Sequence, residues 1–335
     1  MRPIGFRYAL AAFALALCLV RPAAAEVDTL RLAKQFGIGY LQLILMEDLK
    51  TVEKHAERQG LKTKVEWNTF RSSDVMIDAL LSDTLDVASL GLPGLALIAD
   101  RTRGRLDVRG IAGLNVIDLV LTVRKPGITS LRDFGPNDRI AVPAVKVSNQ
   151  AILLQMAAAK LYGDAAWARL DGLTVSMAHP DATATMLGGQ SEIVANFSSP
   201  PFSYRQLAAP GIRKLTSGNE IVGGAWSFNA LAASAAFRQK NPKTLAAFLG
   251  ALDETTAAIN KDKKWAAENY LRITKDRASL DDILAILEDP ANRYTTVPEG
   301  VKTWVDFMAK VGTLRQTPAD WRELFHPEMA RPGQS

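Results

Sequence analysis

Cysteine is almost absent from this sequence, since Cys18 is the one cysteine in 335 residues. Cys18 lies in an N-terminal segment that we predict is cleaved off. The mature chain then has no disulfide and no thiolate chemistry, which excludes a disulfide scaffold. Its stability has to come from packing alone.

Histidine is scarce too, and the common enzyme motifs are missing. The three histidines, His55, His179 and His326, are too dispersed in the sequence to form a metal-ligand motif. There is no Gly-x-Ser-x-Gly nucleophile motif, no phosphate-binding Gly-Lys-Ser/Thr loop and no Gly-x-Gly-x-x-Gly dinucleotide motif. The sequence therefore predicts neither an enzyme nor a cofactor or metal site. A secreted hydrolase or lyase, with a site assembled by the fold, stays open as an alternative.

The apolar run at the N-terminus is too short to anchor the chain in a membrane. Ala9–Val20 falls below the ~20 residues that a membrane-spanning helix needs. It follows Arg2 and Arg7 and precedes three alanines at 23–25, which is the pattern of a cleaved secretion signal. We predict that residues 1–25 form a signal peptide and that cleavage occurs after Ala25.

The charge balance gives no sign of a nucleic-acid partner. The formal charge is +5 for the whole sequence, and removal of Arg2, Arg7 and Arg21 with the signal lowers it to +2. No dense run of Lys and Arg occurs in the rest of the chain. We therefore expect no nucleic-acid partner.

The length and the order of short elements predict an α/β protein with two lobes. At 335 residues and 48% hydrophobic content, the chain exceeds the ~250–300 residues at which single cores stop growing. From Thr29 on, β-like runs alternate with helical periodicity, which is typical of mainly parallel sheets flanked by helices. No Ser/Gly-rich linker separates the halves, so we expect strands to join them. Lobe 1 is predicted to comprise residues 26–118 and 226–335, and lobe 2 residues 119–225.

The individual elements follow from hydrophobic periodicity. We expect strands at 30–33, around 65–67, and at 86–89, 108–114, 119–123, 140–142, 173–177, 193–195 and 226–231. We expect helices around 41–52 and 76–81, and at 151–161, 242–260, 263–273, 280–287, 301–311 and 319–325, with a short helix through 186–187. Turns are expected at 91–93 and 178–181. The strands at 119–123 and 226–231 cross between the lobes and are the predicted hinges.

Polar loops follow several of these strands and lead into helices. In open α/β sheets the ligand crevice lies beyond the carboxyl ends of the strands, where helix N-termini present free N–H groups. The loops and nearby aromatic residues supply the candidate ligand-binding residues, which are Gln35, Phe36, Tyr40, Ser72, Ser73, Gly91, Pro93, Asn115, Lys146, Ser148, Asn149, His179, Ser198, Ser199, Phe202 and Trp226.

The composition of these loops favours particular ligands. Their side chains are mainly hydroxyl, amide, aromatic and basic, and Asp181 is the one carboxylate among them. Such a set suits an oxyanion, with Lys146 as a charge-assisted donor, or a neutral molecule rich in acceptors. The alternatives are that Lys146 is solvated surface and that Ser72, Ser73 and Ser148 are helix caps.

Several motifs, in their order and spacing, resemble those of one protein family. They are 30–32 ahead of a Gly-rich loop, Asp86-Val87-Ala88 with Gly91 and Pro93, 130–134 ahead of 140–143, Pro200-Pro201-Phe202, Asn241-Pro242 and 290–296. With the secretion signal, they make the chain similar to the periplasmic solute-binding proteins of the nitrate/sulfonate/taurine class of ABC importers. The similarity covers essentially the whole mature chain. The class also includes relatives that resemble thiamine-pyrimidine binders.

This resemblance implies the two-lobed type II periplasmic-binding-protein fold, with a ligand cleft between the lobes. It places ligand-facing loops at Gly91 and Pro93, at 146–149 and at 198–201. It implies a monomer in the periplasm that captures a small anion, such as a sulfonate, taurine or a nitrate-like solute. The partner would be an inner-membrane ABC permease with its cytoplasmic ATPase. A pyrimidine-like or other heterocyclic nutrient remains an alternative ligand, and a sensor module that reports ligand occupancy remains an alternative role.

Overall fold

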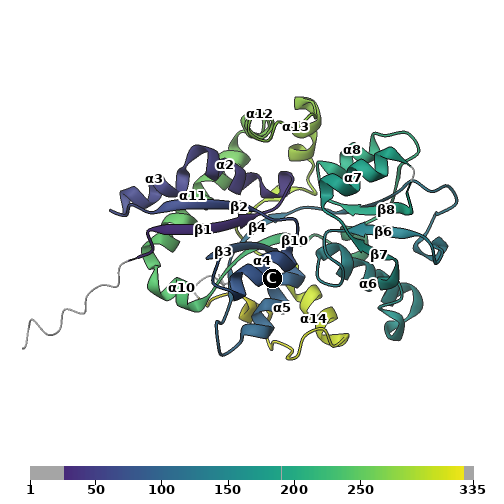
Figure 1. The fold of residues 1–335 in the computed structure, drawn as a ribbon, viewed down its shortest axis with the longest axis horizontal. Helices are drawn as coiled ribbons and strands as arrows, with labels where there is room; N and C mark the ends of the chain where they lie inside the picture. Colours follow the sequence, from purple (N-terminus) through teal and green to yellow (C-terminus); the bar gives the residue numbers. More distant parts are fainter. Residues whose placement is uncertain (1–25, 190, 328–335) are drawn as a thin grey trace, which may run out of the picture.

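The computed structural model describes residues 26–189 and 191–327 (Figure 1). The predicted signal peptide, residues 1–25, lies outside these residues, and so does Ala25 at the predicted cleavage site. None of the helices in the described ranges is long and apolar enough to cross a membrane.

Two sheets stand side by side, each flanked by helices above and below (Figure 1). The first sheet has the strand order β11-β4-β10-β3-β1-β2 and belongs to lobe 1. Its strands are β1 (Thr29–Lys34), β2 (Lys64–Thr69), β3 (Val87–Gly91), β4 (Arg109–Val116), β10 (Ser227–Ala233) and β11 (Arg293–Tyr294). The second sheet has the order β7-β6-β8-β5-β9 and belongs to lobe 2. Its strands are β5 (Val120–Val123), β6 (Arg139–Val142), β7 (Thr174–Ser176), β8 (Ile193–Ser198) and β9 (Arg213–Ser217).

Most strands of each sheet run in one direction. In lobe 1, β1 pairs in parallel with β2 and β3, whereas β10 runs antiparallel to both β3 and β4. In lobe 2, β6 pairs in parallel with β7 and β8, whereas β5 runs antiparallel to β8 and β9. The prediction of two lobes with mainly parallel sheets is confirmed. The reversed strands β5 and β10 are those that follow the two crossings between the sheets.

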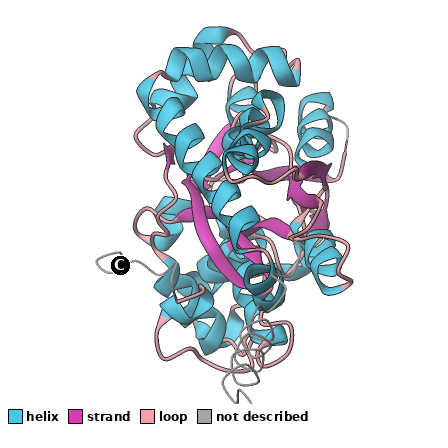
Figure 2. Ribbon diagram, turned by 90° about the vertical axis from the view of Figure 1, so that its left-hand side faces the viewer, coloured by secondary structure: helices cyan, strands magenta, loops and turns pink. Residues whose placement is uncertain are grey.

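The helices divide between the lobes in the same way (Figure 1), and the view in Figure 2 shows helices above and below the strands. Lobe 1 carries α2 (Leu41–Leu49), α3 (Thr51–Arg58), α4 (Ser73–Leu81), α5 (Leu92–Thr102), α10 (Ala235–Lys240), α11 (Pro242–Lys261), α12 (Lys263–Thr274), α13 (Leu280–Glu288) and α14 (Val301–Lys310). Lobe 2 carries α6 (Asn149–Tyr162), α7 (His179–Gly188), α8 (Phe202–Leu207) and α9 (Gly218–Val222). Short 3-10 turns lie at Ile38–Tyr40, Leu131–Asp133, Asp164–Ala166, Asp171–Leu173 and Trp321–Leu324. The exact lobe boundaries, 118/119 and 225/226, stay a prediction.

Two segments that were predicted as turns are first turns of helices. Helix α5 begins at Leu92 with Pro93 in its first turn, and α7 begins at His179 with Pro180 in its first turn. A proline is tolerated there because the first backbone N–H groups of a helix have no partner within the helix. No helix was predicted at 92–102, since residues 92–99 are all buried and show no amphipathic period.

The core of the protein crosses the junction between the lobes. Helix α5 of lobe 1 packs against α6 of lobe 2, and one cluster of buried apolar side chains includes residues of both. At the second crossing, the buried Trp226 ring lies 4.6 Å from the Trp304 ring of α14, centroid to centroid. A Cβ atom on Gly218 of α9 would lie 2.9 Å from the Trp226 ring. Trp226 therefore packs against elements of both lobes.

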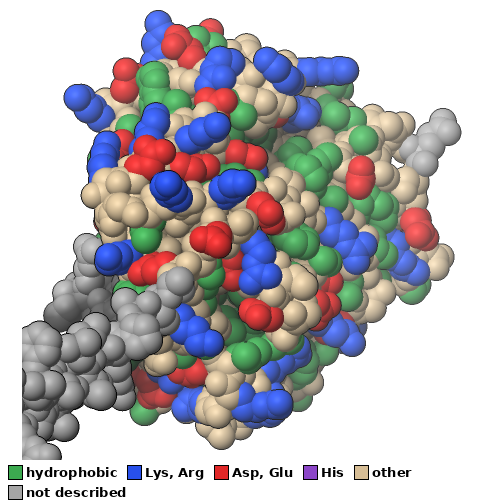
Figure 3. Space-filling model, turned by 60° about the vertical axis from the view of Figure 1, so that its left-hand side comes forward, with side chains coloured by type: hydrophobic (Ala, Val, Ile, Leu, Met, Phe, Trp, Pro, Cys, Tyr) green, Lys and Arg blue, Asp and Glu red, His purple; other side chains and the backbone are tan. Residues whose placement is uncertain are grey.

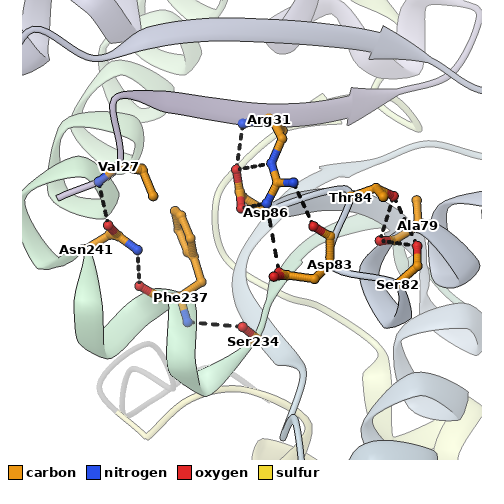
Figure 4. Close-up of polar contacts among 10 residues, drawn as sticks. All are labelled: Val27, Arg31, Ala79, Ser82, Asp83, Thr84, Asp86, Ser234, Phe237 and Asn241. Atoms are coloured by element: carbon orange, nitrogen blue, oxygen red, sulfur yellow. Dashed lines mark hydrogen bonds and ion pairs between the residues drawn. The ribbon is translucent and has the colours of Figure 1, made fainter.

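An ion pair ties β1 to the entry of β3 (Figure 4). The Arg31 guanidinium donates to the two carboxylate oxygens of Asp86 at 3.0 and 2.6 Å, and to the Asp83 carbonyl at 2.7 Å. The Asp86 carboxylate also accepts the backbone N–H of Arg31. This buried carboxylate thus has several donors, which offset the cost of removing its charge from water.

On the face of the molecule shown in Figure 3, acidic and basic side chains are interspersed.

The first described residues are bound to the N-terminus of α11. The Glu26 carboxylate accepts the backbone N–H groups of Lys243 and Thr244 at 2.8 and 2.6 Å. Next to it, the Val27 N–H donates to the Asn241 side chain at 2.8 Å (Figure 4). Glu26 therefore acts as the cap of a 20-residue helix whose own N-cap residue makes no side-chain cap bond.

We expect Glu26→Ala to lower the free energy of unfolding by about 0.5–2 kcal/mol, because it removes this cap and a carboxylate at the positive end of α11. Urea denaturation of the secreted protein measures the change. Glu57→Ala, at an exposed position of α3, is the matched control and should change stability little. Equal stability of the Glu26 variant and the wild type would contradict the capping role.

Candidate functional site

A small cavity lies between the two lobes. Its volume is about 20 Å³, enough for one water-sized group. It is lined by Gln35, Tyr40, Ser73, Gly91, Pro143, Ser148, Asn149, Gln150, His179, Phe228 and Asn229. The lobes are therefore closed on each other in this structure.

Lobe 1 supplies its part of the lining from strand ends and from β10. Gln35 follows β1, Gly91 ends β3, and Ser73 begins α4, and the Gln35 amide donates to the Ser73 hydroxyl at 3.3 Å. Phe228 and Asn229 are consecutive residues of β10. Asn229 Oδ1 lies 3.5 Å from the Tyr40 hydroxyl.

Lobe 2 supplies the first turns of two helices. The Ser148 hydroxyl caps α6 by accepting the Ala151 N–H at 3.3 Å, so its predicted role as a helix cap is confirmed. Asn149 and Gln150 follow Ser148 as the first residues of α6, and His179 is the first residue of α7. Both helices begin directly beyond parallel strands, β6 and β7.

Four helices begin at the cavity. Helices α4, α6 and α7 start at lining residues, and the lining residue Gly91 is the N-cap of α5. Each helix N-terminus carries unpaired N–H groups and roughly half a positive charge. Their convergence gives the cavity a positive potential without any basic side chain.

The lining itself carries no charge. Among the described residues, no Lys, Arg, Asp or Glu lines the cavity. Burial raises the pKa of the Tyr40 hydroxyl and lowers the pKa of His179 from 6.5 to about 4, so both groups are neutral near pH 7. The Oδ1 atom of Asn149 and the Nδ2 atom of Asn229 have no partner among the described residues, which leaves an acceptor and a donor for a bound molecule.

His179 has weak partners only. Its Nε2 lies 3.4 Å from the Gln150 amide nitrogen and its Nδ1 lies 3.5 Å from the Ser198 hydroxyl. Its ring stacks on Phe202 with the centroids 5.5 Å apart and an angle of 17° between the planes. The imidazole is thus held by stacking and burial, and its nitrogen atoms are not committed to short hydrogen bonds.

Two glycines of lobe 1 allow the lobes to meet. A Cβ atom on Gly91 would lie 2.6–2.8 Å from the side-chain amide of Asn149, which itself donates to the Phe228 carbonyl at 2.7 Å. Gly37 has φ +102°, and a Cβ atom there would lie 3.0 Å from the Phe202 ring and 3.1 Å from the Pro200 carbonyl. Any side chain at these positions would push against lobe 2.

A wider pocket of about 320 Å³ adjoins the cavity, and Gln35 lines both. Phe36, which is 41% exposed, and Phe202 form part of its wall. Lys34 and Glu47 in this wall form an ion pair with each other. The wall of this outer pocket is therefore mixed, with aromatic residues in it and with the charges of Lys34 and Glu47 paired.

The structure brings together many of the candidate residues. Those that line the cavity are Gln35, Tyr40, Ser73, Gly91, Ser148, Asn149 and His179. Those that line only the outer pocket are Phe36 and Phe202. Those that lie outside both linings are Ser72, Pro93, Asn115, Lys146, Ser198, Ser199 and Trp226. Contact between any of them and a ligand stays a prediction.

Lys146 lies outside the lining of the cavity, whereas a donor to a bound oxyanion is expected to lie within it. Lys146 is exposed, and its backbone is left-handed with φ 64°. Burial raises the pKa of the Asp171 carboxyl, and the hydrogen bond from Gln155 and the positive charge of Lys146 offset this in part. The alternative of solvated surface fits this position, because a loop residue with a left-handed backbone can point away from the helix start two residues later.

The other residues outside the linings have structural partners. The Ser72 hydroxyl contacts the Asp74 carboxylate, and the Asn115 amide donates to the Gly39 carbonyl. Pro93 is buried in the first turn of α5, and Trp226 is packed at the second crossing.

Four lining residues were not among the candidates: Pro143, Gln150, Phe228 and Asn229. Asn229 is an amide within a fully buried and otherwise largely apolar strand, a signal that was available in the sequence. Gln150 directly follows two candidates.

Solved structures show the same fold at low sequence identity. The alkanesulfonate-binding protein SsuA of Xanthomonas axonopodis, solved with MOPS bound, superposes with a TM-score of 0.68 at 17% identity, over 88% of this chain and 96% of that one. The periplasmic aliphatic sulphonate-binding protein SsuA of Escherichia coli gives 0.64 at 17%, over 91% and 99%. The periplasmic nitrate-binding protein NrtA of Synechocystis gives 0.66 at 16%, over 90% and 85%.

No protein-family model matches this chain, and no curated protein sequence does. The structural similarity shows the fold, and the predicted periplasmic-binding-protein fold is thereby confirmed.

We expect His179 to make the protein sensitive to acid. Its pKa is about 4 when folded and near 6.5 when unfolded, so the unfolded chain binds the extra proton as the pH falls. The contribution of His179 to the free energy of unfolding then falls by up to about 1.4 kcal/mol for each pH unit by which the pH is lowered, between about pH 6.5 and 4. Urea denaturation at several pH values should show that His179→Gln removes this slope, whereas His55→Gln retains it. An equal slope in both variants would contradict the buried, neutral state of His179.

We expect Gly91→Ala to prevent full closure of the lobes while the fold is retained, because the new methyl group would overlap the Asn149 amide. Small-angle scattering should give a larger radius of gyration for this variant than for the wild type. Gly172→Ala is the matched control, since a Cβ atom there meets nothing within 4 Å. An unchanged radius with an unchanged Tm would show that closure does not depend on the missing side chain.

Proposed function

We propose that this chain, which has the fold of periplasmic binding proteins, is the substrate-binding component of an ABC importer. It captures a small anionic solute, such as a sulfonate, taurine or a nitrate-like ion, by closure of the two lobes. It then presents the solute to an inner-membrane permease that works with a cytoplasmic ATPase. It acts as a monomer in the periplasm and is not an enzyme.

The convergence of four helix N-termini on one enclosed cavity carries this proposal. The cavity, at about 20 Å³ in this closed structure, has to widen to admit an anion, which would then accept backbone N–H groups at the positive ends of the helices. The Ser73 hydroxyl and the Asn229 amide are donors within the same lining. A cation would find no carboxylate among the lining residues that the structure describes.

The arrangement of the lobes supports capture by closure. The chain passes between the two sheets in the short segments before β5 and before β10, and not through a long flexible linker. Rotation about two such crossings opens and closes a cleft without repacking either lobe. The Asn149 bond to Phe228 and the packing of Asn149 on Gly91 hold the closed state.

The ligands and the location of the solved proteins with this fold support the ligand class and the location. Two of them bind sulfonates and one binds nitrate, and two are described as periplasmic. The predicted signal peptide at 1–25 leads to the same compartment.

A neutral heterocycle, such as a pyrimidine, is a second candidate ligand. The stacked pair of His179 and Phe202 supports it, because a flat ring extends such a stack. The unpaired donor of Asn229 and acceptor of Asn149 match the edge of a ring that offers both kinds of group.

We expect methanesulfonate, taurine or nitrate to raise the Tm, since a ligand at 100 times its Kd stabilises the folded protein by about 2.7 kcal/mol. Calorimetry should then show that Ser73→Ala weakens binding about tenfold, because a hydrogen bond to a charged group contributes roughly 1.5–3 kcal/mol.

Lys146→Ala is the control and should bind like the wild type, since Lys146 is exposed and outside the lining. Stabilisation by uracil and by none of the anions would favour the heterocycle. Turnover of any of these compounds would contradict the binding role.

A further inference from the structure

An anion in a neutral cavity presents an electrostatic problem. Moving a charged group out of water is costly unless a counter-charge or several hydrogen bonds compensate for it. The helix N-termini supply part of the compensation, but the described lining residues hold no permanent positive charge. Among these residues, His179 is the one side chain that becomes positive by taking up a proton.

The geometry of His179 suits it to supply a positive charge to the bound anion. Its Nε2 lies on the side of Gln150, which lines the cavity, and its Nδ1 lies on the side of Ser198, which does not. A protonated ring donates from both nitrogens. Nδ1–H then has the Ser198 hydroxyl as acceptor, and Nε2–H is left on the cavity side for the ligand.

Within the described ranges, the charged groups on the elements next to His179 are exposed or have other partners. On α7 itself, Asp181 is exposed. On α8, which packs against α7, Arg205 pairs with Asp276 at 2.6 Å and Tyr204 donates to Asp289 at 2.6 Å. Strand β8 carries no titratable residue. Burial alone accounts for the lowered pKa of His179.

Four more groups lie on the elements around α7 and α6, and one of them is Arg124, after β5, which donates to the Met186 carbonyl of α7. Arg139, in β6, donates to the Pro136 carbonyl. Lys160, in α6, donates to the Ile221 carbonyl. Tyr40 faces the same cavity from lobe 1 and is neutral near pH 7.

We propose that an anion binds this cavity together with one proton, which His179 takes up at Nε2 as the ligand enters. The inference rests on the proposed function and adds that the cavity takes up one proton with each anion that binds. The proton comes from the buffer, whose conjugate base remains in solution. The site then holds an imidazolium–anion pair and is neutral overall, as it is when empty.

The proposal fixes the sign of the pH dependence. Without an anion, burial keeps the imidazole neutral, and its pKa is about 4. A bound anion raises this pKa, so the complex holds one more proton than the free protein between the two pKa values. The affinity then rises about tenfold for each pH unit lost in that range and is constant above the pKa of the complex.

Calorimetry with methanesulfonate tests this, because that ion stays anionic across the whole range and cannot itself carry the proton. We expect the Kd to rise from about pH 5 upward and then level off. Near the low end, titrations in two buffers of different ionisation enthalpy should report close to one proton taken up. His179→Gln should bind with no pH dependence and no proton uptake, whereas His55→Gln should match the wild type.

The outcomes separate the two proposals. Methanesulfonate binding in the wild type without proton uptake overturns the proton-coupling inference and leaves the proposed function standing. This measurement does not depend on whether the His179 variant folds. Proton uptake that persists in the folded His179→Gln variant also overturns the inference. If neither methanesulfonate nor nitrate nor taurine binds at any pH, the proposed function itself fails.

Discussion

The site depends on one topological constraint: the carboxyl ends of parallel strands from two separate sheets face the same gap. Strands β1 and β3 end at this gap from lobe 1, and β6 and β7 end there from lobe 2. The chain crosses between the sheets twice, and each time the next strand, β5 or β10, is reversed relative to its neighbours. Four of the helices that follow parallel strands, α4, α5, α6 and α7, therefore begin at the gap, and the described lining residues there have neutral side chains.

The charges of the protein are kept away from this cavity. Asp86 is held by Arg31 at the opposite ends of β1 and β3, and Arg205 of lobe 2 pairs with Asp276 beside α12. A permanent charge in the cavity would be solvated in the open state and would lose water on closure. Neutral amides, hydroxyls and an imidazole avoid that cost until a ligand arrives.

Much of this arrangement could be predicted from the sequence, because the carboxyl ends of parallel strands lie at the same edge of a sheet. Polar residues that directly follow such strands therefore lie at that edge. Gln35, Ser73, Asn149 and His179 were found in this way. Asn229 was missed, since it lies within β10 and reaches the cavity through the reversal of that strand, which no local pattern reveals. The exposed position of Lys146 could not be decided from the sequence, because the direction of a loop side chain depends on a left-handed backbone that the sequence does not specify.

The packing of Trp226 gives the protein an optical reporter of its own motion. The ring lies at the second crossing, against Trp304 of lobe 1 and beside Gly218 of lobe 2. Its indole N–H has no hydrogen-bond partner among the described residues. A rotation of the lobes about this crossing would change the surroundings of these two adjacent indoles, which are two of the six tryptophans in the sequence, and would thereby change the emission of the unlabelled protein.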